Sequence, residues 1–255
     1  MIHRLEPPEQ AAALFAGWEE TMIWSCLTGA MGEVYADAPE APGSAMAALG
    51  DFCFFAGRPC RELLRFALEE PRRGCHILVP RDPAWAALME ENCGETLRRA
   101  VRYAIKKEPG VFDRAQLEEA TASLPPGHRL VPLDRGWFHR CRESQWSRDF
   151  TAQYRDWAHF RQYGLGVLVL RGEELVAGAS SYSGWPGGIE VEIDTRADCR
   201  RRGLAHAAGA ALILACLDRG WYPSWDAQNL ASAALAEKLG YHVSHEYPVY
   251  ERFAD

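Results

Sequence analysis

The feature that most constrains this chain is a short basic segment between a predicted strand and a predicted helix. Residues 189–195 alternate apolar and acidic side chains, as is typical of a half-buried strand. Residues 200–205 read Arg-Arg-Arg-Gly-Leu-Ala, and an alanine-rich apolar run predicts a helix over 203–218. A glycine-containing turn at a helix start directs several backbone N–H groups at one point, where the helix dipole adds partial positive charge. The segment therefore predicts a phosphate or diphosphate site.

Two further blocks follow the basic segment in a fixed order. Asn229 comes directly after a predicted strand, and the helix that follows ends in Leu-Ala-Glu-Lys-Leu-Gly-Tyr at 235–241. The spacing Arg200-x-x-Gly203-x-Ala205, with these two blocks behind it, resembles the GNAT acyltransferase superfamily. In that superfamily the Q/R-x-x-G-x-G/A loop holds the diphosphate of acetyl-CoA.

The resemblance implies a fold for the C-terminal half. Residues 128–255 read as strand, two helices, three strands, helix, strand, helix and strands, which is the GNAT order. We expect an α/β (α+β) chain, with a C-terminal GNAT fold whose central mixed, mostly antiparallel sheet is flanked by helices. Residues 1–110 predict an N-terminal mixed α/β domain without an assigned role, whose element order resembles a GNAT half that lacks the coenzyme loop. Pro and Gly residues place the boundary within 111–127.

The same resemblance implies an acetyl-CoA site. Gly203 lets the main chain approach the diphosphate without a Cβ in the way. Three adjacent arginines can add charge-assisted contacts, although not all three can face one phosphate. The alternative for the loop alone is a basic turn that begins an ordinary helix, and the alternative for Asn229 is a helix N-cap. The predicted coenzyme-binding residues are Thr195, Arg200, Arg201, Arg202, Gly203, Leu204, Ala205, Asn229 and Ser232.

Acetylation of an amine needs a base, because an alkyl ammonium has a pKa near ~10. Glu190, Glu192 and Asp194 alternate with apolar residues, so their carboxylates share one face of the predicted strand. Such a face attracts a cationic amine. We predict Glu192, and after it Glu190, as the catalytic base, and Asp194 as an acceptor contact. The alternative for each residue is a strand with one solvated face.

The sequence departs from the GNAT pattern at the position of the general acid. Many GNATs carry a tyrosine seven residues after this asparagine, and here the position is Ala236. Tyr250 is the predicted replacement, with Tyr247, Tyr182 and Ser232 as the other candidates. Ala236 also keeps open a second class of function, a non-catalytic acyl-CoA-binding sensor or interaction protein.

The acceptor side is predicted from an aromatic and acidic group in a connecting loop, where binding residues are common. Its members are Trp146, Asp149 and Phe150, and a core role for Trp146 stays open. The wording of residues 223–227 and their surroundings is similar to the GNAT subgroup that contains the zwittermicin A resistance protein. That resemblance implies N-acetylation of a primary amine on a small, polar, antibiotic- or metabolite-like molecule, with a protein N-acetyltransferase as the alternative.

Composition limits the classes of partner and the cellular location that we expect for this protein. The net charge is −7, which argues against nucleic acid. The chain contains neither an apolar run of the ~20 residues of a membrane span nor an N-terminal secretion signal, so we expect a cytoplasmic protein with reduced cysteines. His242 and His245 have no evident third ligand, so no metal is expected. The oligomeric state is left open, a homodimer included.

Overall fold

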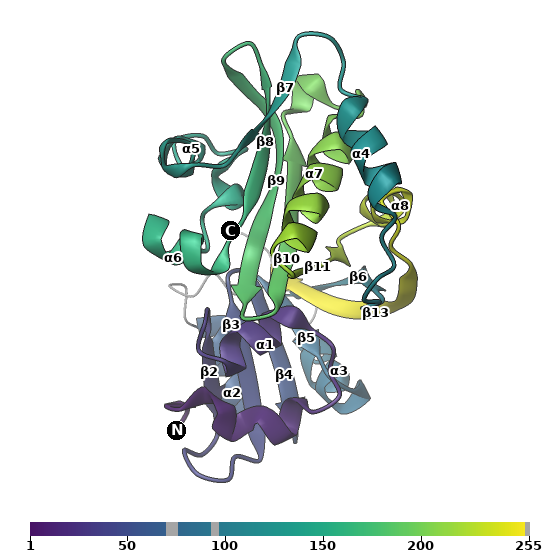
Figure 1. Ribbon diagram of the computed structural model, residues 1–255. Helices are drawn as coiled ribbons and strands as arrows, with labels where there is room; N and C mark the ends of the chain where they lie inside the picture. Colours follow the sequence, from purple (N-terminus) through teal and green to yellow (C-terminus); the bar gives the residue numbers. More distant parts are fainter. Residues whose placement is uncertain (70–75, 93–96, 253–255) are drawn as a thin grey trace. The chain divides into compact units, whose positions relative to one another are not determined.

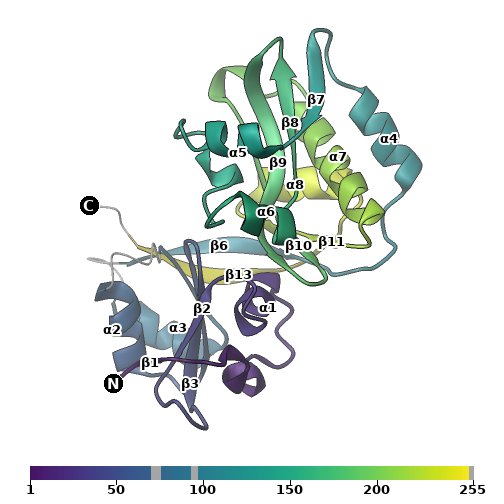
Figure 2. The ribbon, with the colours of Figure 1, turned by 60° about the vertical axis from the view of Figure 1, so that its left-hand side comes forward.

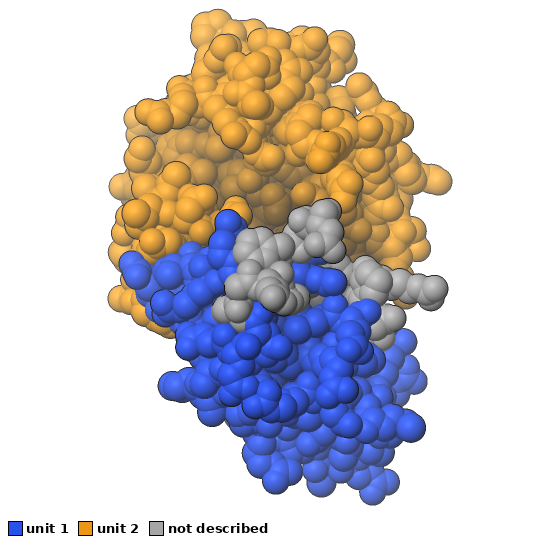
Figure 3. All heavy atoms as spheres, turned by 180° about the vertical axis from the view of Figure 1, so that it is seen from behind, with its two compact units in different colours: residues 1–102, 246–255 blue, residues 103–245 orange. Residues whose placement is uncertain are grey.

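The computed structural model describes residues 1–69, 76–92 and 97–252. The chain forms two compact units, residues 1–102 with 246–255, and residues 103–245 (Figure 3). The strands β6 (Leu97–Ile105) and β13 (Val243–Arg252) contain the boundaries between them. This division differs from the boundary expected within 111–127. Residues there form α4 (Arg114–Ala122), whose Leu117 and Ala120 pack into the core of the second unit.

The first unit is built on an antiparallel meander followed by a parallel strand (Figure 1). Its elements are β1 (His3–Arg4), the 3-10 helix η1 (Pro8–Phe15), α1 (Thr21–Leu27), β2 (Glu33–Ala36), β3 (Ser44–Leu49), β4 (Phe52–Gly57), α2 (Arg61–Glu69), β5 (Ile77–Pro80) and α3 (Pro83–Glu90). The sheet order is β1-β2-β3-β4-β5-β13-β6-β12. The sequence predicts one strand over 45–56, whereas the structure has the hairpin β3–β4, which turns at Gly50 with φ +55°.

The last strand of the chain completes the sheet of this first unit. Tyr250 of β13 pairs antiparallel with Leu78 of β5. Its ring is fully buried in a core that also contains Phe55, Leu63 and Trp85. The sequence predicts two separate terminal strands after residue 241, and the structure joins them into one. In the same unit Cys53 is disulfide-bonded, which corrects the expectation of a reduced thiol at that position, whereas Cys26, Cys60, Cys141, Cys199 and Cys216 are free.

The second unit contains a five-stranded sheet in the order β11-β10-β9-β8-β7. Helix α7 covers one face and α5, η3 and α6 cover the other (Figures 1 and 2). After α4, its elements are β7 (His128–Pro132), α5 (Arg135–Cys141), the 3-10 helix η3 (Arg148–Phe150), α6 (Trp157–Tyr163), β8 (Gly166–Arg171), β9 (Glu174–Trp185), β10 (Gly188–Thr195), the 3-10 helix η4 (Ala197–Cys199), α7 (Leu204–Asp218), β11 (Tyr222–Ser224), β12 (Asp226–Ala227) and α8 (Leu230–Lys238). The elements and mixed sheets match the predicted α/β GNAT fold class.

Local sequence explains two features of the helices in this unit. The side chain of Asp156 accepts a hydrogen bond from His159 N at 2.8 Å, so it caps α6 and makes that helix shorter than the predicted 150–162. Small residues let α7 lie close to the sheet, and Ala207, Ala208 and Gly209 are buried there. Among the described residues, no helix has the length and apolarity needed to cross a membrane.

Candidate coenzyme and acyl-transfer site

A cavity of about 820 Å³ opens in the second unit where β10 and β11 separate. The two strands pair in parallel from Gly188–Tyr222 to Glu190–Ser224, and β10 then continues to Thr195. The cavity lies between the end of β10 that extends beyond its pairing with β11, the start of α7 and helix α8. Its lining residues are Ile193, Asp194, Thr195, Cys199, Arg200, Arg201, Gly203, Leu204, Ala205, His206, Gln228, Asn229, Ala231, Ser232, Ala234, Leu235 and Lys238.

The segment between β10 and α7, residues 196–203, is called the β10–α7 loop below. Arg201 has φ +64° and Gly203 has φ +79°, so two residues take the left-handed conformation. Gly203 is the N-cap of α7 and supplies no side-chain bond. Within the described part of the chain, no acceptor is recorded for the backbone N–H groups of residues 201–206. Unbonded N–H groups at a helix start, with left-handed residues among them, form an anion-binding concavity.

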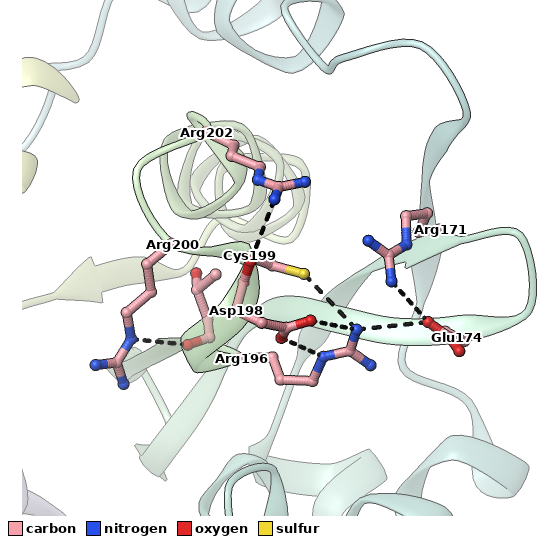
Figure 4. Close-up of polar contacts among 8 residues, drawn as sticks. Arg171, Glu174, Arg196, Asp198, Cys199, Arg200 and Arg202 are labelled. Carbon is pink, nitrogen blue, oxygen red and sulfur yellow. Dashed lines mark hydrogen bonds and ion pairs between the residues drawn. The ribbon is translucent and has the colours of Figure 1, made fainter.

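The three consecutive arginines, Arg200 to Arg202, have different surroundings, and Figure 4 shows Arg200 and Arg202 pointing in different directions. Arg200 folds along the end of β10, where its Nε donates to the carbonyl of Thr195 at 3.1 Å and its Nη2 lies 3.6 Å from Asp194 Oδ1. Arg201 lines the cavity. Arg202 Nη2 donates to the carbonyl of Asp198 at 3.3 Å on the outer side of the loop. The structure therefore places Arg200 and Arg201, but not Arg202, at the cavity.

Helix α8 contributes the opposite wall. Asn229 Oδ1 accepts from the backbone N–H of Ser232 at 3.0 Å, which makes Asn229 an N-cap as well as a lining residue. The indole N–H of Trp225 donates to Ser232 Oγ at 3.1 Å. Ala236 is fully buried in the core beneath the helix.

Some lining residues were not predicted. Ala231, Leu235 and Lys238 follow one another at intervals of four and three, which places them on one side of α8, and Gln228 precedes the helix. A stripe extended at helical spacing from the predicted Asn229 runs through Ser232 and Ala236 instead, so it would not have found them.

The acidic residues of β10 lie on one face of the strand, as their spacing of two residues predicts. Cross-strand partners share a face of a sheet, and the partners of Glu190, Glu192 and Asp194 on β9 are Ser183, Ser180 and Gly178. A register shift between Glu190 and Val191 marks a bulge in this pairing. Each carboxylate thus lies beside a residue with little or no side chain, and Phe150 and Leu168 fill the space next to Gly178.

The carboxylates differ in exposure. Glu190 is only 3% exposed, whereas Glu192 and Asp194 are half-buried. Ser183 and Ser224, the partners of Glu190 on its two neighbouring strands, are fully buried. In the described structure the hydroxyl groups of both serines lack a hydrogen-bond partner. The hydroxyl of Thr195 at the cavity is likewise buried without a partner among the described residues.

The predicted acceptor group divides into core and surface. Phe150 is 1% exposed, and its ring lies 3.1 Å from where a Cβ on Gly178 would be. It is therefore a packing residue on the acidic face of the sheet. Trp146 packs edge-on against it, with 6.0 Å between ring centroids. Asp149 is exposed and its Oδ1 lies 3.8 Å from Arg148 Nε, and its role as an acceptor contact stays a prediction.

The predicted acid Tyr250 lies in the core of the first unit. Its hydroxyl donates to Glu90 Oε1 at 2.8 Å, and its ring is fully buried. These contacts give Tyr250 a packing role, and they correct its assignment as an acid. Elsewhere, His242 Nδ1 lies 2.7 Å from Glu108 Oε2. No cluster of three metal-ligating side chains occurs in residues 1–69, 76–92 and 97–252.

Comparisons with known proteins agree with this architecture. The chain is 44% identical to a GCN5-related N-acetyltransferase-like protein of Streptococcus suis, with a TM-score of 0.91, over 97% of this chain and 99% of that one. It is 26% identical to YdfB of Bacillus subtilis, an uncharacterised N-acetyltransferase, over 90% of this chain and 89% of the relative. A tandem GNAT protein from the clavulanic acid biosynthesis pathway shares the fold, with 11% identity and a TM-score of 0.54 over the whole of both chains.

The family model described as GNAT acetyltransferase matches residues 12–250, which include most of both units. The loop, the separated strands and the helix pair that enclose the cavity all lie within that match. The chain therefore belongs to the GNAT acetyltransferase family and is an acyltransferase.

Proposed function

We propose that this protein transfers the acetyl group of acetyl-CoA to a primary amine of a small, polar, antibiotic- or metabolite-like molecule. The observation that carries the proposal is the cavity at the start of α7, where unbonded N–H groups of residues 201–206 meet the end of an acidic strand. An anion-binding loop at one end and carboxylates along the adjoining strand suit a thioester donor and a cationic acceptor.

The lining residues fit a CoA diphosphate. The N–H groups of residues 201–206 are available to its oxygens, and Arg200, Arg201 and Lys238 add positive charge. The buried hydroxyl of Thr195 and the side chain of Asn229 offer polar contacts farther along the cavity. When bound, the coenzyme supplies an acetyl thioester, which is the electrophile.

Glu192 is the proposed base. It is half-buried and lies between Glu190 and Asp194 on the acidic face, next to Ser180 of β9. Glu192 takes a proton from the acceptor ammonium, directly or through water, so that the neutral nitrogen can form its bond to the acetyl carbon as the carbon–sulfur bond breaks. The nitrogen then loses its second proton, through water, to the departing thiolate. The deeply buried Glu190 is the second candidate.

Ser232 is the proposed hydrogen-bond donor to the leaving sulfur. Of the hydroxyl groups considered as replacements for the missing tyrosine, it is the one that lines the cavity. Its oxygen already accepts from Trp225 Nε1, which leaves its own proton free to be donated. A thiolate is a fair leaving group, so a hydrogen bond rather than full proton transfer is sufficient.

A second candidate function is acyl-CoA binding without turnover. It is favoured by Ala236, a buried alanine that supplies no acid where many GNATs carry a tyrosine. Release of free CoA from acetyl-CoA in the presence of an amine panel separates the two functions. We expect release with at least one cationic amine, and tight CoA binding without any release would favour the sensor.

Two variants test the assignments within the enzyme. Glu192→Gln should lower kcat by about 10²-fold or more with little change in CoA affinity. Gly203→Glu places a carboxylate at the left-handed N-cap and should abolish CoA binding in calorimetry. Gly220→Glu is the matched control, since Gly220 also has positive φ and open space around it but lies beyond the far end of α7. Unchanged CoA affinity in Gly203→Glu would refute the loop assignment.

A further inference from the structure

Arg196 organises the outer side of the β10–α7 loop (Figure 4). Its Nε and Nη2 donate to the two carboxylate oxygens of Asp198 at 2.7 and 3.0 Å, and Nη2 also lies 3.8 Å from Cys199 Sγ. Its backbone N–H donates to the carbonyl of Val176 at 3.0 Å. The side chain is only 27% exposed. One guanidinium thus links two residues of η4 to each other while its own backbone is fixed to β9.

The guanidinium of Arg196 also contacts the turn between β8 and β9. Glu174 Oε2 lies 3.4 Å from Arg196 Nη2 and accepts from Arg171 Nη2 at 2.9 Å. The hydrogen bond from Arg171 and the nearby charge of Arg196 lower the pKa of Glu174. The hydrogen bond from Arg196 similarly lowers the pKa of Asp198. Both carboxylates are therefore charged at neutral pH and keep the network intact.

The loop needs support of this kind before an anion arrives. Arg201 is a left-handed non-glycine residue, a conformation that is unfavourable for a residue with a Cβ. The N–H groups of residues 201–206 have no recorded acceptor in the described structure, so hydrogen bonds from them do not hold the loop in shape. Contacts on the outer side can do so, because they leave the cavity side open.

We propose that Arg196 is a positioning residue for the coenzyme diphosphate, acting through Asp198 and Cys199 on the shape of the loop. It is absent from the cavity lining, whereas Arg200 and Arg201 lie there, so it does not act by touching the phosphates. Arg202 contributes to the same outer contacts through the carbonyl of Asp198. This inference rests on the proposed function, because it assigns a role toward the CoA that the loop is proposed to bind.

The test compares Arg196→Gln with the matched control Arg129→Gln. Arg129 belongs to the same sheet and contacts the same β8–β9 turn, through Glu173 at 2.8 Å and the carbonyl of Gly172 at 2.9 Å, but it does not contact the loop. Arg196→Gln should weaken CoA binding in calorimetry about tenfold, since a loop that is preformed in only a tenth of molecules binds tenfold more weakly. Arg129→Gln should bind CoA as the unmodified protein does.

Kinetics and a conservative variant separate positioning from general stability. In Arg196→Gln the KM for acetyl-CoA should rise about tenfold while kcat at saturating acetyl-CoA is unchanged. Arg196→Lys should recover only part of the affinity, because an ammonium cannot reproduce the two-pronged contact with Asp198. Arg196→Gln and Asp198→Asn should be non-additive when combined.

The outcomes are distinguishable. Equal CoA affinity in Arg196→Gln and in the unmodified protein would overturn the positioning role and leave the proposed function standing. Equal losses in Arg196→Gln and Arg129→Gln, with matching drops in thermal midpoint, would assign the effect to stability and overturn the role as well. Failure of the unmodified protein to bind CoA would overturn the proposed function and the positioning role together.

Discussion

The two units repeat the same order of elements but differ at the site where the second has its cavity. Each has a strand, two or three helical segments (η1 and α1 in the first unit, α5, η3 and α6 in the second), an antiparallel meander of three strands, a helix, a strand parallel to the last of the meander, and another helix. In the second unit eight residues, 196–203, separate β10 from α7. In the first unit three residues, 58–60, separate β4 from α2. The element order is shared, and the loop is not.

The backbone of the shorter loop is already hydrogen-bonded. Arg58 N donates to the carbonyl of Gly43 at 2.8 Å, and the Arg58 carbonyl accepts from Ser44 Oγ at 2.5 Å. In the longer loop the backbone N–H groups of Arg196 and Cys199 are hydrogen-bonded and the side chains of Arg196 and Asp198 pair, while the N–H groups of residues 201–206 stay available. An anion site therefore requires that the turn be stabilised without the amides that face the anion.

The helices that follow differ in one side chain. Asp82 caps α3 and Asn229 caps α8, and the third residue after each cap is Trp85 in the first unit and Ser232 in the second. Trp85 is fully buried, packs on Phe55 and donates to the carbonyl of Gly57 at the end of β4, at 2.8 Å. In the first unit, Trp85 fills the region that corresponds to the one Ser232 leaves open in the second unit. We infer that each chain binds one coenzyme.

The largest expected effect comes from removing the indole of Trp85. Trp85→Ala should destabilise the protein by about 3–5 kcal/mol, because a buried indole is replaced by a cavity. Denaturant unfolding measures this loss. Calorimetry of the folded variant should still give one CoA per chain, since the backbone of the turn at Arg58 remains hydrogen-bonded. A second CoA equivalent would show that the indole alone closes the first unit.

The converse change should fill the cavity of the second unit, as Trp85 fills the corresponding region of the first. Ser232→Trp places an indole in the cavity and should weaken CoA binding by about 100-fold, the equivalent of about 2.7 kcal/mol. The matched control is Glu237→Trp, an exposed position on α8 that does not line the cavity. Isothermal calorimetry compares the two, and comparable affinity in both variants would contradict the equivalence of Trp85 and Ser232.

A smaller effect should separate capping from coenzyme contact. Asn229→Ala and Asp113→Ala each remove an N-cap, from α8 and α4, and each should cost about 1 kcal/mol of stability in denaturant unfolding. Only Asn229 lines the cavity, so only Asn229→Ala should also weaken CoA binding, by about fivefold. Equal affinity in the two variants would leave Asn229 with a capping role alone.

The smallest effect concerns pH. The pKa values of Glu174 and Asp198 are lowered, so their contribution is present above the ordinary carboxyl range and is lost as pH falls through the lowered values. The ratio of CoA affinities between the unmodified protein and Arg196→Gln should therefore be constant from about pH 5 to 8 and fall only below about pH 4. Taking a ratio cancels titration of the coenzyme. A ratio that changes near neutral pH would contradict the network.

Sequence predicts the parts of the site that depend on local pattern. Alternation alone placed Glu190, Glu192 and Asp194 on one face, and the loop residues Arg200 to Ala205 precede a helix as predicted. Pairings between distant segments were not accessible in the same way. No local signal indicates that Tyr250 pairs with Leu78, 172 positions earlier, and for this reason it was misassigned as an acid. Arg196 was missed although Asp198 and Cys199 are two and three residues away, and only its third partner, Glu174, lies in another turn.

The placement of β13 has a consequence for how the chain acquires its structure during synthesis. The sheet of the first unit needs residues near Tyr250 beside β5, yet β1 to β5 and most of β6 are complete by residue 102. At about 5–20 residues per second, the ribosome adds the intervening stretch in roughly 7–30 s. Through that interval the edge of β5 lacks its β13 neighbour, so the N-terminal unit is translated first but completed last.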